Sequence, residues 1–132
     1  MNRREARKQA FMLIFQYNFQ PEETETLMND FFDRNKADGQ RDYIEGAVRG
    51  VMEKADEIDA LIEKYAGSVG VDRISSVSLA VLRLGTYEML YMEDIPAAVS
   101  VNEAIGLAKE YDGDEAAPFI NGVLGKIKDE IR

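Results

Sequence analysis

The stretch VDRISSVSLAVLRLGTYEMLYM, residues 71–92, decides the fold class. Its apolar residues lie nearly all round a helical wheel, which is typical of a helix that is buried on every side. They are Val77, Leu79, Val81, Leu82, Leu84, Leu90 and Tyr91. Asp72 is a suitable N-cap. The sequence therefore predicts a central buried helix from Arg73 to about Met92, which Gly85 can bend or divide in two.

Helical periodicity continues on both sides of this segment, because apolar residues recur there at three- and four-residue spacing. We expect further helices over residues 2–19, 24–35, 41–65, 97–111 and 115–131. Gly46 and Gly50 weaken the third of these by roughly 1 kcal/mol each relative to Ala, so we expect another helix to approach closely there. The prediction is a single all-α domain over residues 1–132, a compact bundle of six or seven helices.

Composition excludes several classes of protein. No apolar run reaches the roughly 18–20 residues that span a bilayer, and polar residues between Gln9 and Gln20 interrupt any signal peptide, so we expect a cytosolic protein. The chain has no cysteine and no histidine, which removes thiol chemistry and the commonest general base and metal ligand. Asp112, Asp114 and Glu115 lack the ligand spacing of a calcium loop. We predict no enzyme, no metal and no cofactor.

Charge is segregated along the chain. The four cations among residues 2–8, less Glu5, give that segment a net +3, although the formal net charge of the whole chain is -9. A basic end on an acidic body is typical of a site that binds phosphate groups, although terminal cations are often only solvated. The alternatives are a nucleic-acid-binding protein, a protein-interaction module whose basic end steers it to an acidic partner, and an enzyme that uses carboxylates.

The first helix carries aromatic rings beside its cations. Ala6, Ala10, Leu13, Ile14 and Tyr17 share the face that should pack on the body. Phe11 and Phe15 fall on the neighbouring arc with Arg4, Arg7 and Lys8. These two rings have two interpretations: they pack under the second helix, which offers Phe31 and Phe32, or they form an exposed anchor for a protein partner.

Three stretches together resemble the NusB family of bacterial transcription antitermination factors. They are RREARK at 3–8 running into FQY at 15–17; VLRLGTYEML at 81–90 with IP at 95–96 and VNEAIGLAK at 101–109; and FINGVLGKI at 119–127. The resemblance implies a fold of two small helical subdomains and binding to the boxA element of ribosomal RNA leader transcripts. It also implies a heterodimer with the ribosomal protein NusE and assembly with other Nus factors on RNA polymerase. It leaves open whether the isolated chain is a monomer or a homodimer.

The resemblance also implies site residues. Those expected to bind RNA are Arg3, Arg4, Arg7, Lys8, Phe119 and Asn121. Phe119 would stack on a base and Asn121 would bond a base edge, while the alternatives are core packing for Phe119 and backbone bonding for Asn121. The residues expected to contact the partner are Phe11, Phe15 and Ser78, with Phe15 the better candidate of the two rings.

Other residues of the matching stretches are expected to be structural: Arg83, Tyr87, Glu88, Asn102 and Glu103. Arg83 and Glu88 should pair with buried polar groups, because an unpaired buried charge is costly. The chain departs from the family pattern at Gly70-Val71, where many members have Trp, and at Pro118. Acids at 112, 114 and 115 lie beside the expected RNA groove, so we expect RNA binding by the lone chain to be weak and dependent on the partner.

Overall fold

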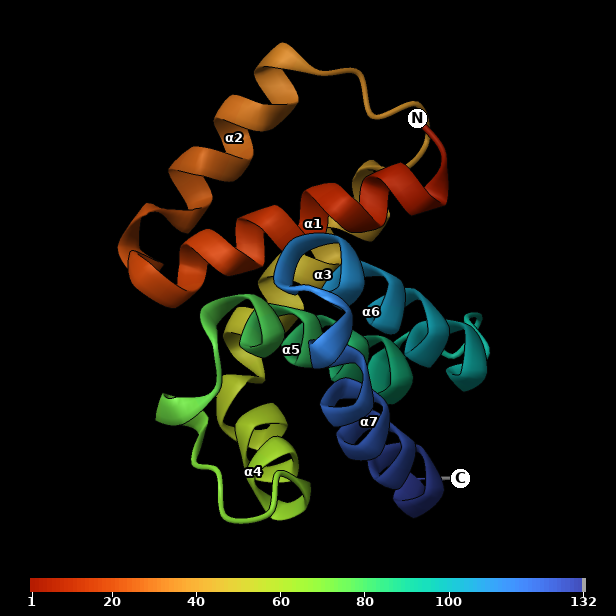
Figure 1. The fold of residues 1–132 in the computed structure, drawn as a ribbon. Coiled ribbons are helices and arrows are strands. Elements are labelled where there is room, and N and C mark those ends of the chain that lie inside the picture. The colour runs from red at the N-terminus through yellow and green to blue at the C-terminus, as the bar shows by residue number, and fades with distance from the viewer. Residues whose placement is uncertain (132) are drawn as a thin grey trace.

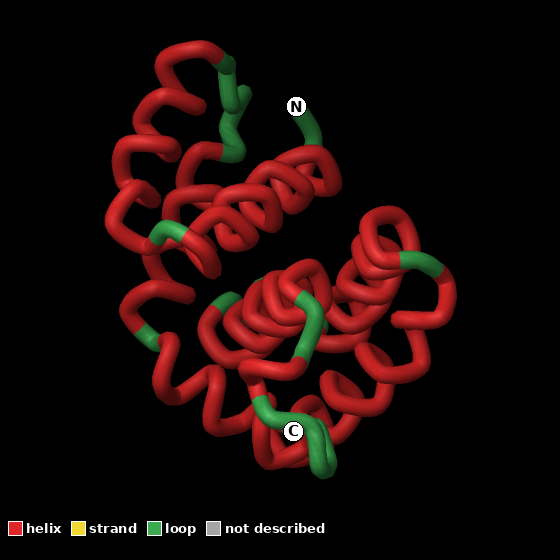
Figure 2. The backbone as a smooth tube through the Cα atoms, turned by 60° about the vertical axis from the view of Figure 1, so that its left-hand side comes forward, coloured by secondary structure: helices red, strands yellow, loops and turns green. Residues whose placement is uncertain are grey.

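A computed structural model describes residues 1–131 of the chain as helices joined by short turns and loops (Figure 1). The α-helices are α1 (Arg3–Phe19), α2 (Thr24–Arg34), α3 (Arg41–Glu53), α4 (Ala55–Tyr65), α5 (Ser76–Tyr91), α6 (Ala97–Asp112) and α7 (Ala117–Ile131). Single 3₁₀ turns precede α2, α5 and α7, at Pro21–Glu23, Val71–Arg73 and Asp114–Ala116. Residues 1–131 contain no strand, which confirms the all-α prediction (Figure 2). None of these helices is long and apolar enough to cross a membrane.

Helix α5 is the centre of the fold, as the sequence predicts. It packs against α1, α3, α4, α6 and α7, and Leu82 has no exposed surface. The prediction is wrong for Tyr91, which lies at the last turn, is 41% exposed and donates a hydrogen bond to Glu57 of α4 at 2.7 Å. Gly85 does not divide the helix: it admits α7, because a Cβ at this position would lie 3.0 Å from Leu124 Cδ1.

The N-terminus of α5 also differs from the prediction. Ser75, not Asp72, caps the helix by accepting a hydrogen bond from the Ser78 amide at 3.1 Å. Asp72 lies one turn earlier, in the 3₁₀ turn Val71–Arg73. The hydroxyl at Ser75 satisfies one of the amides that a helix start leaves unpaired.

The predicted helix over 41–65 is two helices, α3 and α4, separated at Lys54. Helix α3 packs on α1 and α5, whereas α4 packs on α5 and α7, and Figure 1 shows the chain changing direction between them. A single straight helix could not follow both surfaces. The close approach expected at the α3 glycines occurs at Gly50, where an added Cβ would lie 2.0 Å from Tyr87 Cζ; at Gly46 the contact is an ordinary one.

Helices α1, α2 and α3 form one group and α4, α6 and α7 another, and α5 joins the two (Figure 1). Arg83 of α5 forms a bidentate ion pair with Asp59 of α4 at 2.8 and 2.9 Å, and it also donates to Asn18 of α1. The expectation of polar pairing is confirmed for Arg83, because α5 has neighbours on all sides and its charges must be compensated there.

Candidate nucleic-acid interface

The N-terminal cations are placed by the first two turns of α1. Asn2 caps the helix by accepting from the Glu5 amide at 2.8 Å, so the helix begins at Arg3. With 3.6 residues per turn, cations at positions 3, 4, 7 and 8 cannot all face the same way. The structure accordingly divides them into an inward pair and an outward pair.

Arg7, which was expected among the RNA-binding residues, points inward. It is 5% exposed, and its guanidinium donates to Glu88 at 2.8 and 3.2 Å and to Glu103 at 3.2 Å. Burial acts to lower the pKa of Arg7, but the hydrogen bond and the charge of Glu88 outweigh it and raise the pKa. Arg7 therefore stays charged, and its donors are occupied by carboxylates within the fold.

Glu88 is the acceptor around which four helices meet. Besides Arg7 of α1, it accepts hydrogen bonds from Tyr43 of α3 at 2.5 Å and from Ser100 of α6 at 2.8 Å. Burial and the neighbouring Glu88 charge raise the pKa of Tyr43, so its hydroxyl remains a donor. The expectation that Glu88 is structural is confirmed, and its partners fix the orientation of α1.

Arg3 also turns toward the body. Its Nε donates to Gln40 Oε1 at 2.7 Å, and its guanidinium carbon lies 4.4 Å from the centre of the Tyr43 ring. A cation over an aromatic face is attracted by the ring quadrupole. Arg3 is half-buried and is thus partly engaged by the fold.

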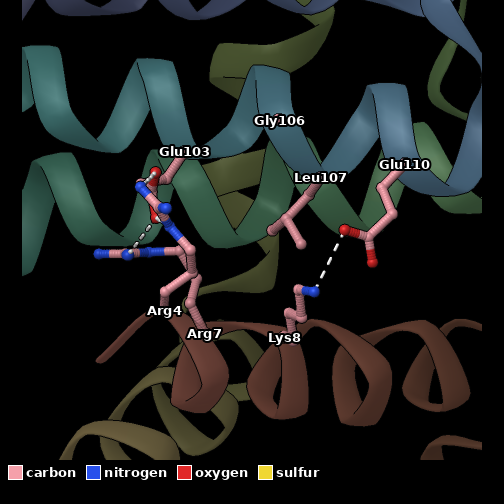
Figure 3. Close-up of a pocket in the computed structure, with 7 residues that line it drawn as sticks. All are labelled: Arg4, Arg7, Lys8, Glu103, Gly106, Leu107 and Glu110. Carbon is pink, nitrogen blue, oxygen red and sulfur yellow. Dashed lines mark hydrogen bonds and ion pairs between the residues drawn. The ribbon is translucent and has the colours of Figure 1, made fainter. Parts of the chain in front are cut away.

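Arg4 and Lys8 point outward, over a groove between α1 and α6 (Figure 3). The Arg4 side chain is 76% exposed, and its Nε and Nη2 donate to the two carboxylate oxygens of Glu103 at 3.0 Å each. Lys8 Nζ lies 3.2 Å from Glu110 Oε1. The groove has a volume of about 270 Å³, and its lining is completed by the buried Arg7 of α1 and by Gly106 and Leu107 of α6. Of the four cations, Arg4 is the most exposed, and Lys8 is half-buried beside it.

Asn121 lies on a second groove, on the other side of α6. This groove has a volume of about 720 Å³ and is lined by Asn102, Ile105, Lys109, Asp114, Ala117, Pro118 and Asn121. The side chains of Asn102, Lys109 and Asn121 are exposed, and Asp114 is the one acid in the lining. Asn102, which was expected to be structural, is therefore exposed on the same groove as Asn121.

Phe119 does not share this surface with Asn121. It is half-buried and lines a third groove, of about 310 Å³, together with Ser75, Ser78, Asp112 and other residues. Two residues along a helix correspond to a rotation of about 200°. Helix α7 therefore directs Phe119 and Asn121, both of which were expected to bind RNA, to different sides.

The expected partner residues also separate. Phe11 is 3% exposed, and its ring packs 5.0 Å from that of Tyr111 on α6, so it is not an exposed anchor. Phe15 is half-buried and meets Phe19 edge to face at 5.1 Å. Phe19, which we did not expect to contribute, is 59% exposed. The sequence could have predicted that Phe19 belongs with Phe15, because Phe11, Phe15 and Phe19 follow at four-residue spacing along one side of α1.

Ser78 is buried, and its hydroxyl donates to Asp112 at 2.8 Å, as that of Ser75 does at 2.7 Å. Asp112 therefore accepts hydrogen bonds from two serines at the start of α5, the N-cap Ser75 and Ser78. Asn18 of α1 donates to the Ser76 carbonyl at 3.1 Å, which ties the Phe15–Phe19 end of α1 to the start of α5. The hydrogen bond from Asn18 therefore links the part of α1 that carries Phe15 and Phe19 to the start of α5, where Ser78 lines the third groove.

Comparison with known proteins gives one consistent result. The model of the NusB family matches residues 4–129. The transcription antitermination protein NusB of Acetivibrio thermocellus is 45% identical over 130 residues, which covers 96% of this chain and 88% of that protein. The protein of the same name from Bacillus subtilis is 42% identical, covering 99% of this chain and 98% of that protein.

Solved structures agree with the sequence matches. The structure of T. maritima NusB superposes with a TM-score of 0.91 at 34% identity, covering 98% of this chain and 92% of that one. A structure of antitermination factors NusB and NusE in complex with double-stranded RNA contains a chain that superposes with a TM-score of 0.86 at 26% identity. That match covers 97% of this chain and 96% of the other.

Proposed function

The chain belongs to the NusB family, and we propose that it is a non-enzymatic antitermination factor that binds boxA of ribosomal RNA leader transcripts together with NusE. In this proposal the pair joins other Nus factors on RNA polymerase. The solved complex of NusB and NusE with double-stranded RNA supports both partners by analogy. The resemblance of the sequence motifs supports the choice of boxA.

One observation carries the RNA part of the proposal: two grooves flank α6. The first lies between α1 and α6 and carries the outward cations of α1, and the second lies between α6 and α7 and carries exposed amides of both helices. Arg4 and Lys8 line one groove beside α6, and Asn102, Lys109 and Asn121 line the next. Cations bind phosphate groups irrespective of sequence, whereas amides both donate to and accept from base edges. An RNA strand that crosses α6 would meet both kinds of group.

The proposal assigns NusE to the surface formed by Phe15, Phe19 and the Ser78 groove. Phe119 lies on that groove and not beside Asn121. We therefore propose that Phe119 contacts RNA only where the strand passes from α7 toward the partner. For the NusE surface, aromatic side chains such as Phe15 and the exposed Phe19 are the type that supplies much of the binding energy in protein interfaces.

The test is a titration of labelled boxA RNA, and of a scrambled RNA of equal length, with and without NusE. The variant Arg4→Gln/Lys8→Gln should weaken binding and reduce the log–log salt slope by up to about 0.7 per lost contact with single-stranded RNA. The control Arg34→Gln/Lys36→Gln removes the same charge from exposed positions at the end of α2 and just beyond it. Equal effects of the two variants would contradict the RNA site.

The partner surface is tested separately with Phe15→Ala/Phe19→Ala. We expect a loss of NusE affinity of about 2 kcal/mol or more, measured by calorimetric titration. RNA binding by the lone chain should change little. Normal NusE binding by a folded variant would place the partner elsewhere, and NusE binding without preference for boxA would favour a protein-interaction module.

A further inference from the structure

Two acids of α6, Glu103 and Glu110, form ion pairs with Arg4 and Lys8, the cations on which the proposed RNA site depends. We propose that Glu110, together with Glu103, competes with RNA phosphate for Lys8 and Arg4, so that Glu110 sets the affinity and the salt dependence of the site. This inference rests on the proposed function. In the α1–α6 groove, the two cations are already paired with carboxylates of the same chain.

The geometry of both pairs matches that of phosphate binding. Arg4 donates two parallel bonds of 3.0 Å to the two oxygens of Glu103, which is the fork that guanidinium groups also present to phosphate. Lys8 Nζ is held at 3.2 Å from Glu110. In Figure 3 the Glu103 and Glu110 carboxylates reach from α6 toward the cations of α1. A phosphate group that enters this groove must therefore displace a carboxylate.

The two acids differ in what else they hold. Glu103 also accepts from the buried Arg7 at 3.2 Å, and its side chain is 19% exposed, so its removal would disturb the helix packing. Glu110 is more exposed, at 46%, and its ion pair is with Lys8. Hydrogen bonds from Tyr111 and from Lys8 hold the pKa of Glu110 below its usual range, so it is charged at neutral pH. Glu110 is thus the competitor that can be removed with the fold intact.

The salt dependence distinguishes competition from a general charge effect. RNA binding normally releases the cations condensed on its phosphates, and the logarithm of affinity falls with the logarithm of salt concentration. When phosphate displaces Glu110 from Lys8, the freed carboxylate attracts a cation from solution. That uptake offsets part of the release, so the wild-type slope is shallower than the number of contacts would give.

The experiment measures fluorescence anisotropy of labelled boxA RNA with the protein and NusE over a series of salt concentrations. Glu110→Gln should tighten binding about two- to fivefold at low salt, the range expected when an exposed ion pair no longer has to be broken. Its slope should steepen by up to about 0.7. The control Glu63→Gln removes the same charge from an exposed position on α4, away from α1 and α6 (Figure 1), and should change neither value appreciably.

A second pair of variants tests whether the effect passes through Lys8. In a Lys8→Gln background, the further change Glu110→Gln should give a smaller gain than it gives in the wild type. Equal affinity and slope for Glu110→Gln and Glu63→Gln, with RNA bound by both, would overturn the inference and leave the proposed function standing. Failure of the folded wild type to bind RNA with NusE present would overturn both.

Discussion

Replacement of Arg7 by Met tests whether this cation belongs to the fold or to the RNA site. The unbranched Met side chain has a similar reach but carries no charge. In the variant, Glu88 loses the bonds of 2.8 and 3.2 Å from Arg7 and keeps those from Tyr43 and Ser100. A carboxylate that is 1% exposed is then left without a cation.

The expected cost follows from the burial of the pair. Removing one partner of a buried ion pair typically destabilises a protein by about 3–5 kcal/mol, because the other charge remains uncompensated. The Arg7 and Glu88 side chains are 6% and 1% exposed, so solvent cannot replace the lost partner. We expect Arg7→Met to lower the free energy of unfolding by about 3–5 kcal/mol. For a domain of this size, that corresponds to a fall of about 10–20 °C in Tm.

Urea and thermal unfolding, followed by far-UV circular dichroism, measure this loss. The double variant Arg7→Met/Glu88→Gln is the matched control: it removes the orphaned charge but keeps an amide oxygen that can accept from Tyr43 and Ser100. The double variant should therefore be more stable than Arg7→Met alone. At temperatures where it is folded, Arg7→Met should bind RNA with an unchanged salt slope. If Arg7→Met were as stable as the wild type, or if its salt slope for RNA binding were shallower, Arg7 would belong to the RNA site.

Three further predictions concern the core, the α3–α5 contact and pH. Leu82→Ala should reduce the free energy of unfolding by about 2–5 kcal/mol in urea titrations, because a side chain with no exposed surface leaves a cavity. Gly50→Ala should cost about 1–3 kcal/mol, since the Tyr87 ring must move away from the new methyl group, and a melt no lower than that of Gly46→Ala would contradict this. Bonds from Arg4 and Lys64 lower the pKa of Glu103 and Glu130 from 4.5, so their contribution to stability is present above that pH. The urea midpoint should accordingly fall as pH drops below about 4.5. A midpoint unchanged down to pH 3 would show that these two ion pairs do not contribute to stability.

The helices could be predicted from the sequence because apolar spacing and turn residues act locally. The boundary between α3 and α4 could not, since Lys54 is a good helix former and neither Gly nor Pro marks the break. That break comes from tertiary packing, where α3 follows α1 and α4 follows α7. Capping shows the same limit: Asp72 and Ser75 are both good caps, and only the fold selects Ser75.

Two features of the expected site residues were not foreseen from the sequence, and the reasons differ. The burial of Arg7 depends on Glu88, which lies 81 residues away, and no local pattern reports such a pairing. The separation of Phe119 from Asn121, by contrast, follows from helical geometry alone, since neighbours at i and i+2 do not share a face. Sequence motifs group residues along the chain, whereas a surface groups them by their angle about the helix axis.

The basic N-terminal segment therefore has a structural role, and its proposed role in RNA binding depends on it. Arg7 binds Glu88 and Glu103, which join α1 to α5 and α6, and Arg3 lies on Tyr43 of α3. These contacts fix the rotation of α1 about its axis, and that rotation directs Arg4 and Lys8 over α6. A charge count over residues 2–8 overstates the cations available to the proposed RNA site, because Arg7 is buried and Arg3 is partly engaged by the fold. The affinity of the proposed site should then follow the outward pair and the carboxylates that compete for it, more than the number of basic residues in the segment.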